Sequence, residues 1–267
     1  MVKDTGVLLR VRLTRGTDKL IALSGIAKRF QALTNDTYVA GMWQKHLAQQ
    51  LHWHTNTRSS VVRSGESDAM QSAKATEQEE WRAPSWSRAS IDDPTSPSLD
   101  TSQSESGLLI RVDGVQIRAV SNDVTGVLKG ASLRLQGTLK AVSFRRRLVK
   151  PGRLPYWDTY IADQDMHVHF YPDRPGLDLA TLSAQHLLFY VPSNLRASSS
   201  GPGSTLDSLA LQLVDAARAV YRRIGLISAG KPERIATMMA LQAEEHAHPC
   251  LQYSKKSPHY RHTICLI

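Results

Sequence analysis

Histidines separated by a single residue occur three times in the chain, and their spacing is the closest that the sequence comes to a metal site. The three segments are His52-Trp53-His54, His167-Val168-His169 and His246-Ala247-His248. On a strand, residues i and i+2 point to the same face, so His167 and His169 can chelate one ion together. Two ligands do not make a structural zinc site, however, and the same spacing is typical of histidines on the solvent face of a sheet. We interpret that pair as solvent-facing, with Val168 and Phe170 toward the core.

The richest set of metal-binding side chain types follows near the C-terminus. It consists of Glu245, His246, His248 and Cys250. Carboxylate, imidazole and thiolate groups all bind zinc or copper, which makes this set the better metal candidate. The sequence as a whole still predicts no bound metal and no cofactor, although the spacing of these residues is one that occurs in metal sites.

Motifs of nucleophilic or phosphate chemistry are missing from the sequence. It contains no Gly-x-Ser-x-Gly elbow and no P-loop, and Pro202 removes an amide that a phosphate loop at residues 200–203 would need. The carboxylate pairs Glu79-Glu80 and Asp92-Asp93 lie in polar, turn-rich segments, which do not hold two acids at a fixed distance. We therefore expect no catalytic residues, no cofactor-binding residues and no enzymatic activity in this chain.

The composition indicates a protein with a sizeable core and no membrane span. The chain has 267 residues, of which 41% are hydrophobic, and no apolar run reaches the roughly 18 residues that a membrane-spanning helix needs. Residues 1–15 lack the long apolar region of a secretory signal. The two cysteines, Cys250 and Cys265, are too few for a secreted disulfide scaffold. We expect a cytoplasmic protein with two reduced, partly buried thiols.

The net charge of +9 raises the question of a nucleic-acid partner. The basic residues are dispersed, and the one tight run is Arg145-Arg146-Arg147, followed by Lys150 and Arg153. No aromatic residues alternate with these arginines, as a surface that stacks on bases would require. We interpret the run as a solvated loop, and we expect neither nucleic acid nor membrane as a partner.

The periodicity of apolar residues predicts two helices at the N-terminus. Leu20, Leu23, Ala27 and Phe30 recur at helical spacing within residues 17–33. Asn35-Asp36 ends this helix and can cap a second one over residues 36–52. Because the connection is short, we expect the two helices to form a helical hairpin over residues 17–53.

The rest of the chain divides into a polar segment and a region of short strands. Residues 54–106 predict a flexible segment that carries a tryptophan-containing strand motif at residues 81–90. Residues 107–267 alternate with period two and predict a β-rich domain, with a C-terminal helix beginning at Pro232 and ending near Glu245. Strands are expected within residues 109–119, 127–139, 166–170, 187–191, 209–214, 219–227 and 262–267. The predicted class is α+β: an N-terminal helical hairpin, then a mostly antiparallel sandwich or barrel-like domain with one C-terminal helix.

Four segments together carry a resemblance to one family. In chain order they are TDKLIALSGIA at 17–27, YVAGMWQKHL at 38–47, RAPSWSRAS at 82–90 and YRRIG at 221–225. These segments resemble motifs that follow the signature domain of fungal heterokaryon-incompatibility (HET) proteins, and the resemblance covers residues 17–267. It implies a role in fungal non-self recognition and programmed cell death.

The sequence departs from the family in three ways. The HET signature itself, with its Trp-Gly pair and its WID-CINQ strand, is missing, and the family pattern would place it before residue 1. Arg88 stands where the family usually has tryptophan. Residues 55–80 are longer than the usual connection, which is explained either by a surface insertion or by a retained intron.

The resemblance implies an accessory or recognition region that binds protein partners and has no catalysis of its own. Cell-death activity in the family is attributed to the HET domain, which is similar to Toll/interleukin-receptor (TIR) domains. One alternative is therefore a part of an NAD-hydrolysing enzyme whose catalytic domain is missing here, and a second is a truncated, nonfunctional product. We expect Trp43, Trp53, Trp81 and Trp86 to act through packing, since each can bury about 150–250 Å².

Overall fold

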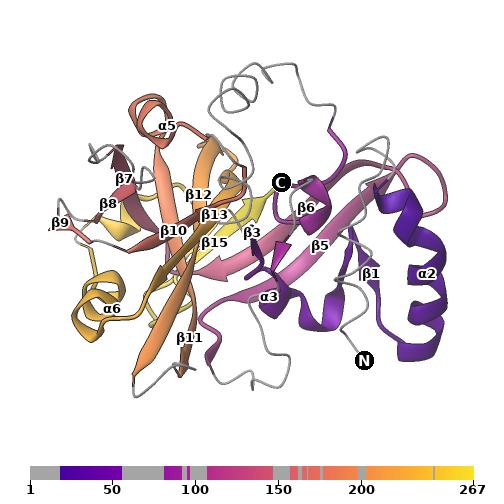
Figure 1. The fold of residues 1–267 in the computed structure, drawn as a ribbon, viewed down its shortest axis with the longest axis horizontal. Coiled ribbons are helices and arrows are strands. Elements are labelled where there is room, and N and C mark those ends of the chain that lie inside the picture. The colour runs from indigo at the N-terminus through magenta and orange to yellow at the C-terminus, as the bar shows by residue number, and fades with distance from the viewer. Residues whose placement is uncertain are drawn as a thin grey trace, which may run out of the picture.

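The fold is of the α+β class, with a helix near the N-terminus, a large and mostly antiparallel sheet, and a helix near the C-terminus (Figure 1). The computed structural model describes residues 19–55, 81–91, 95–96, 107–146, 157–161, 164–166, 168–174, 177–197, 203–242 and 244–267. The helices are α2 (Lys19–Thr34), α3 (Leu47–Gln50), α5 (Leu179–Gln185) and α6 (Pro232–Met239). Within the described residues, no helix is long and apolar enough to cross a membrane.

Most strands of the described residues join in one sheet. Its main path runs β5 (Arg111–Ala119), β6 (Leu128–Gly137), β15 (His262–Leu266), β13 (Val220–Ala229), β12 (Ser204–Asp215), β11 (Leu188–Ala197), β7 (Lys140–Arg146), β8 (Trp157–Ile161) and β9 (Gln164–Asp165). Beside this path, β10 (His169–Pro172) pairs with β13, and β14 (Gln252–Tyr253) pairs with β15. The pairing of β13 with β15 is parallel, and the other pairs that the structure describes are antiparallel.

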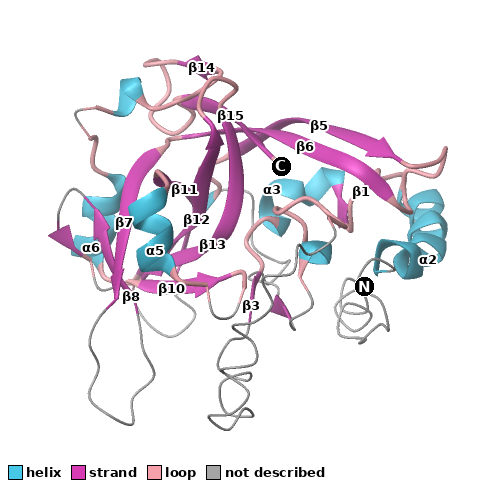
Figure 2. Ribbon diagram, turned by 90° about the horizontal axis from the view of Figure 1, so that it is seen from above, coloured by secondary structure: helices cyan, strands magenta, loops and turns pink. Residues whose placement is uncertain are grey.

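The sheet curls until the residues just before its first strand meet β11, which gives a barrel-like arrangement, one of the two alternatives, sandwich or barrel-like, that the sequence predicts. Leu108 forms an isolated bridge with Asn194, and the Leu109 amide donates to the Ser193 carbonyl at 2.9 Å. The close approach requires a glycine in β6, because a Cβ on Gly137 would lie 2.4 Å from Cγ1 of Val191. The curl encloses one face of the strands and leaves the other face for α5 and α6 (Figure 2).

Both faces of the central strands are buried, which explains their continuous apolar runs. In β11, Phe189 and Val191 belong to a cluster that faces β6 and the N-terminal segment. Their neighbours Leu188 and Tyr190 belong to a second cluster, on the side of α6. Residues from 20–51, 83–89 and 110–266 contribute to the first cluster, so these segments share one core. The predicted boundaries at residues 53 and 106 stay predictions.

The prediction of a second helix over residues 36–52 is wrong. The first helix ends as predicted: Asn35 has φ of 50° and its amide bonds the Gln31 carbonyl, a left-handed cap. The chain then forms a tight β-hairpin from β1 (Tyr38–Val39) and β2 (Met42–Trp43). Ala40 and Gly41 at its turn have φ of 48° and 93°, and two positive values are the signature of such turns and are incompatible with a helix. Within the predicted helix, only the 3-10 turn η2 (Gln44–His46) and the short helix α3 are helical.

The motif at residues 81–90 is not a strand, which corrects a second prediction. It forms a bend followed by the 3-10 turn η3 (Arg88–Ser90), where the Ser87 hydroxyl accepts from the Ala89 amide. The two-residue strands β3 (His54–Thr55) and β4 (Thr95–Ser96) precede and follow this region in the chain, and they pair with each other. The predictions for residues 56–80, 92–94 and 97–106 lie outside the described residues.

Most predicted strands of the β-rich region are confirmed, and the C-terminal helix is confirmed in a shorter form. Pro232 stands in the first turn of α6, but the helix ends at Met239 rather than near Glu245.

The sequence missed β7, β8 and α5. Arg145 and Arg146 belong to β7, so the basic run is not a loop there, and Arg145 lies 4.5 Å over the ring of Tyr160 on the neighbouring strand. Arg147, Lys150 and Arg153 lie outside the described residues.

Candidate functional site

The buried guanidinium of Arg223 connects segments that lie far apart in the sequence. Its Nη1 donates to the Leu51 carbonyl at 2.7 Å, and its Nη2 donates to the Trp53 carbonyl and, at 3.1 Å, to Oδ1 of Asp173. The guanidinium also lies 3.7 Å from the ring centroid of Trp53, an arrangement that stabilises a desolvated cation. Arg223 thereby joins β13 to the chain that follows α3.

The motif at 82–90 attaches to the same point from the other side. Trp53 and Trp86 are both fully buried, and Nε1 of Trp53 donates to the Trp86 carbonyl at 2.9 Å. The Ser85 hydroxyl accepts from the Arg223 amide at 2.9 Å, and the Ser87 hydroxyl donates to the Ala40 carbonyl in the turn between β1 and β2. We call Trp53, Ser85, Trp86, Ser87 and Arg223 the motif cluster.

The electrostatics of the motif cluster are those of a desolvated interior. Burial raises the pKa of Asp173 to about 6, although Arg223 acts in the opposite direction. Burial also lowers the pKa of Arg88 to about 10, and the like charge of Arg223 lowers it further. The ionised pair of Asp173 and Arg223 is therefore expensive to bury, and neither charge can lose its partner without a large cost.

A serine and a histidine lie within hydrogen-bond distance beside the motif cluster. Nε2 of His52 is 2.9 Å from the Ser193 hydroxyl, and Nδ1 is 3.0 Å from the Gln49 carbonyl. Burial lowers the pKa of His52, so the ring is neutral and its Nδ1–H donates to the Gln49 carbonyl. The Ser193 hydroxyl donates to the Asp207 carbonyl at 2.8 Å. The distance is that of a nucleophile and its base, but the hydroxyl proton is directed to Asp207 rather than to His52. However, both side chains are fully buried, so no substrate reaches the hydroxyl without opening the sheet.

The tryptophan packing hypothesis yields a test within this cluster. Trp53 and Trp86 are buried as predicted, Trp43 is half-buried, and the prediction is wrong for Trp81, which is 45% exposed.

Trp86→Ala should lower the free energy of unfolding by about 3–5 kcal/mol, because it leaves a large cavity. Arg88→Trp should not lower it, since that change removes a buried cation. Urea unfolding of both variants checks this, and similar small losses from the two would contradict the packing account.

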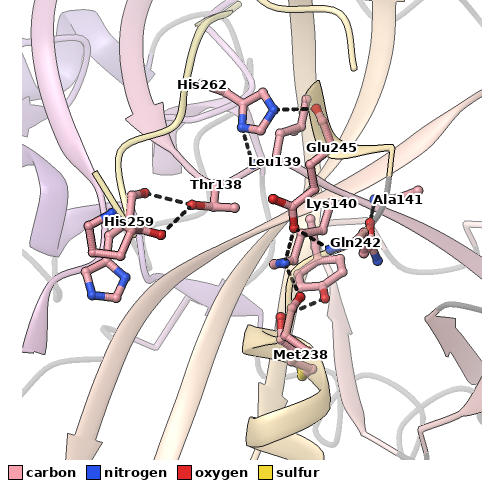
Figure 3. A network of polar contacts seen from close by, with 12 residues as sticks. Thr138, Leu139, Lys140, Ala141, Met238, Gln242, Glu245, His259 and His262 are labelled. Carbon is pink, nitrogen blue, oxygen red and sulfur yellow. Dashed lines mark hydrogen bonds and ion pairs between the residues drawn. The ribbon is translucent and has the colours of Figure 1, made fainter. Parts of the chain in front are cut away.

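A second buried network holds the segment after α6 against the corner between β6 and β7 (Figure 3). Nζ of Lys140 forms an ion pair with Oε1 of Glu245 at 2.5 Å, and the two side chains are only 1% and 3% exposed. Lys140 also donates to the Ala240 carbonyl at 2.6 Å, and the Gln242 amide donates to Oε1 of Glu245 at 2.9 Å. Burial lowers the pKa of Lys140, whereas the hydrogen bonds that Glu245 accepts outweigh its own burial and lower its pKa.

His262 completes this network from β15. Its Nδ1 accepts from the Leu139 amide at 3.0 Å, and its Nε2 lies 2.8 Å from the Glu245 carbonyl, to which it donates (Figure 3). Burial lowers the pKa of His262, in agreement with a neutral ring in this single tautomer. A second proton on Nδ1 would point at the Leu139 N–H and break the contact.

This geometry predicts a loss of stability in mild acid. A folded-state pKa below the unfolded value gives stability that is present above about pH 6.5 and is lost as the pH falls further. Between about pH 7.5 and 5.5 the contribution of His262 should fall by about 1 kcal/mol. In His262→Asn, urea unfolding at the two pH values should show a correspondingly smaller loss. An equal loss in the variant and the wild type would contradict the assigned tautomer.

The histidine pairs of the sequence are not brought together as metal sites. His52 is held by Gln49 and Ser193, whereas the ring of His54 packs on Tyr171 at 4.8 Å. His169 is exposed next to buried Val168, as interpreted, and His167 lies outside the described residues. No cluster of three or more possible metal ligands occurs in the described part of the chain.

The richer candidate set near the C-terminus separates in the structure. The Glu245 carboxylate is paired with Lys140, and His246 is exposed. His248 packs between Phe189 and His262, at 5.1 Å and 6.2 Å between ring centroids. Cys250 and Cys265 are unbridged and partly buried, which confirms that prediction, and burial raises the pKa of Cys250.

A surface groove of about 290 Å³ lies between α3 and the start of β5. Its charged groups are already bonded: Nζ of Lys45 donates to the Asn35 carbonyl at 2.7 Å, and Nε of Arg111 bonds Asp113 at 3.1 Å. Tyr260 lies beneath Arg111 at 5.7 Å. The Lys45 and Arg111 side chains of the groove are therefore paired within the chain.

Three comparisons place the chain against known proteins. No protein-family model matches it, and neither a curated protein nor a solved structure is significantly similar to it.

Proposed function

We propose that this chain is a non-catalytic recognition region of a HET-type protein that takes part in fungal non-self recognition and programmed cell death. One observation carries the proposal: three of the four resembling segments, although far apart in sequence, meet in the motif cluster. A set of motifs that builds a shared interior is what a family of similar folds needs. It is not what an active site needs, because Trp53, Trp86, Ser87 and Arg223 are buried and Ser85 is only partly exposed.

The proposed role is exercised through protein partners in the cytoplasm. The residues of the motif cluster fix the interior, whereas Gln44 and Lys45 of the segment 38–47 line the groove beside β5 together with Gln49. A partner would then bind a surface whose shape depends on the motif cluster beneath it. Substitutions in the cluster would act on recognition indirectly, through the position of η2 and α3.

Expression of the chain alone in fungal cells tests the absence of catalysis. We expect growth equal to that of cells with an empty vector, and no loss of NAD when the purified chain is incubated with it. The matched control is Arg222→Met, at an exposed position of the same strand, which should behave like the wild type in both assays. Cell death or NAD turnover caused by the wild type alone would refute the proposal and favour the NAD-hydrolysing alternative.

A further inference from the structure

Ser257 is a partly exposed serine in a loop without regular secondary structure. Residues 254–261 connect β14 to β15 and contain neither helix nor strand. Pro258 follows the serine, and this pair is the pattern that proline-directed protein kinases select, because proline has a fixed φ and no N–H. The pair occurs once more, at Ser96-Pro97, but Ser96 belongs to β4, whose backbone is paired with β3. A kinase binds an unpaired segment, so the structure favours Ser257.

The surroundings of Ser257 suit a phosphate group. Its Oγ accepts from the His259 amide at 3.3 Å and from the Tyr260 amide at 3.0 Å. Two backbone N–H groups that converge on one oxygen are a common anion-binding arrangement. Lys255 and Lys256 directly precede the serine and are exposed, and within the part of the chain that the structure describes their ammonium groups form no ion pair. A phosphate on Oγ would therefore meet two amides and two neighbouring cations.

The same loop borders the groove between α3 and the start of β5. Tyr260 lines this groove, and the guanidinium of Arg111 lies 5.7 Å from the centroid of its ring. On the other side, the Thr138 hydroxyl donates to the His259 carbonyl at 3.0 Å and anchors the loop to the corner between β6 and β7 (Figure 3). The Tyr260 amide is thus the point at which a change at Ser257 reaches the groove.

We propose that Ser257 is a phosphorylation site and that its phosphate fixes Tyr260 at the rim of the groove. A kinase transfers the γ-phosphoryl group of ATP to Oγ. The Oγ–P bond forms, the bond between the γ-phosphorus and the β,γ-bridging oxygen breaks, ADP leaves, and the hydroxyl proton passes to the catalytic carboxylate of the kinase. The phosphate carries a charge of about −1.5 to −2 at pH 7 and accepts stronger hydrogen bonds from both amides than the hydroxyl does. The effect on the groove rests on the proposed function, whereas the modification itself does not.

Phosphorylation of the purified chain tests the site. The chain is incubated with ATP and a proline-directed serine/threonine kinase, and the phosphate is located by mass spectrometry. We expect phosphate on Ser257, and we expect Pro258→Ala to slow its incorporation by about tenfold or more. The matched control is Ser254→Ala, which removes the other serine hydroxyl of the loop and should be phosphorylated like the wild type. No phosphate on Ser257 in the wild type, or equal incorporation in Pro258→Ala, would overturn the site.

Hydrogen exchange of the phosphorylated wild type tests the consequence without any variant. Exchange of the Tyr260 amide should become about tenfold slower, because this amide then donates to a charged phosphate instead of a neutral hydroxyl. The Val120 amide, which donates to the Val127 carbonyl at the far end of β5, should exchange at an unchanged rate. Equal exchange at Tyr260 with and without the phosphate would refute the effect on the groove. Neither measurement needs a partner or a fungal cell, so its failure is distinct from a failure of the recognition role.

Discussion

Arg223→Met should lower the free energy of unfolding by about 5 kcal/mol or more, the largest effect expected for a single substitution in this chain. The change leaves the buried Asp173 carboxylate without its cation, which alone costs about 3–5 kcal/mol. It also removes the donors to the Leu51 and Trp53 carbonyls, at about 1–3 kcal/mol for each unsatisfied group. Since whole domains are stable by only about 5–15 kcal/mol, much of the variant should be unfolded in water.

Urea unfolding and a double-mutant cycle with Asp173→Asn measure this effect. Asparagine carries no charge, so Arg223→Met should cost less in the Asp173→Asn background than in the wild type. The matched control is Arg222→Met on the exposed face of the same strand, which should change stability by less than about 0.5 kcal/mol. A small loss from Arg223→Met would show that the motif cluster does not hold the fold together.

Lys140→Met should be the second most damaging change, at about 3–5 kcal/mol, because it leaves the buried Glu245 carboxylate unpaired. The local consequence should be the release of the segment after α6, since Lys140 also holds the Ala240 carbonyl. Hydrogen exchange should show early loss of protection at the Gln242 amide, which bonds Glu245.

The double variant Lys140→Met/Glu245→Leu separates the cost of an unpaired charge from the value of the pair. Replacement of both charges with apolar side chains of similar size is often close to neutral, so the double variant should be more stable than Lys140→Met. Lys129→Met, at an exposed position of β6, serves as the control and should have little effect. A double variant as unstable as the single one would contradict the charge-pair account.

The sequence predicted the helices and strands whose apolar residues recur with a regular period. It missed the elements whose formation depends on contacts with residues far away in the chain. Alternation found β6, because one face of this strand lies against the core, and the short apolar run at the C-terminus found β15, whose residues are mostly buried. The helix predicted over residues 36–52 failed because the apolar spacing fits both a helix and a hairpin, and the positive φ angles at Ala40 and Gly41 decide between them. Strand β7 was missed because its arginines gave no apolar signal.

The candidate sites were harder to predict, because their contacts join residues far apart in the chain. Arg223 was noticed only as part of a motif, since its partners Leu51 and Asp173 lie 172 and 50 residues away. Lys140 and Glu245 are 105 residues apart, and a single lysine in a strand gives no sign of burial. Conversely, the closely spaced histidines suggested metal chemistry, but their rings point to different partners in the fold.

A vegetative-compatibility assay tests the central claim most directly, namely that this chain contributes to non-self recognition through the interior that the motifs build. A fungal strain that lacks the gene for the chain, and its undeleted parent, are each paired with a panel of isolates of the same species. We expect the deletion to change compatibility with at least one isolate, and we expect reintroduction of the wild type, but not of Arg223→Met, to restore the parental pattern. An identical pattern for the deleted strain and its parent across the panel would contradict the claim.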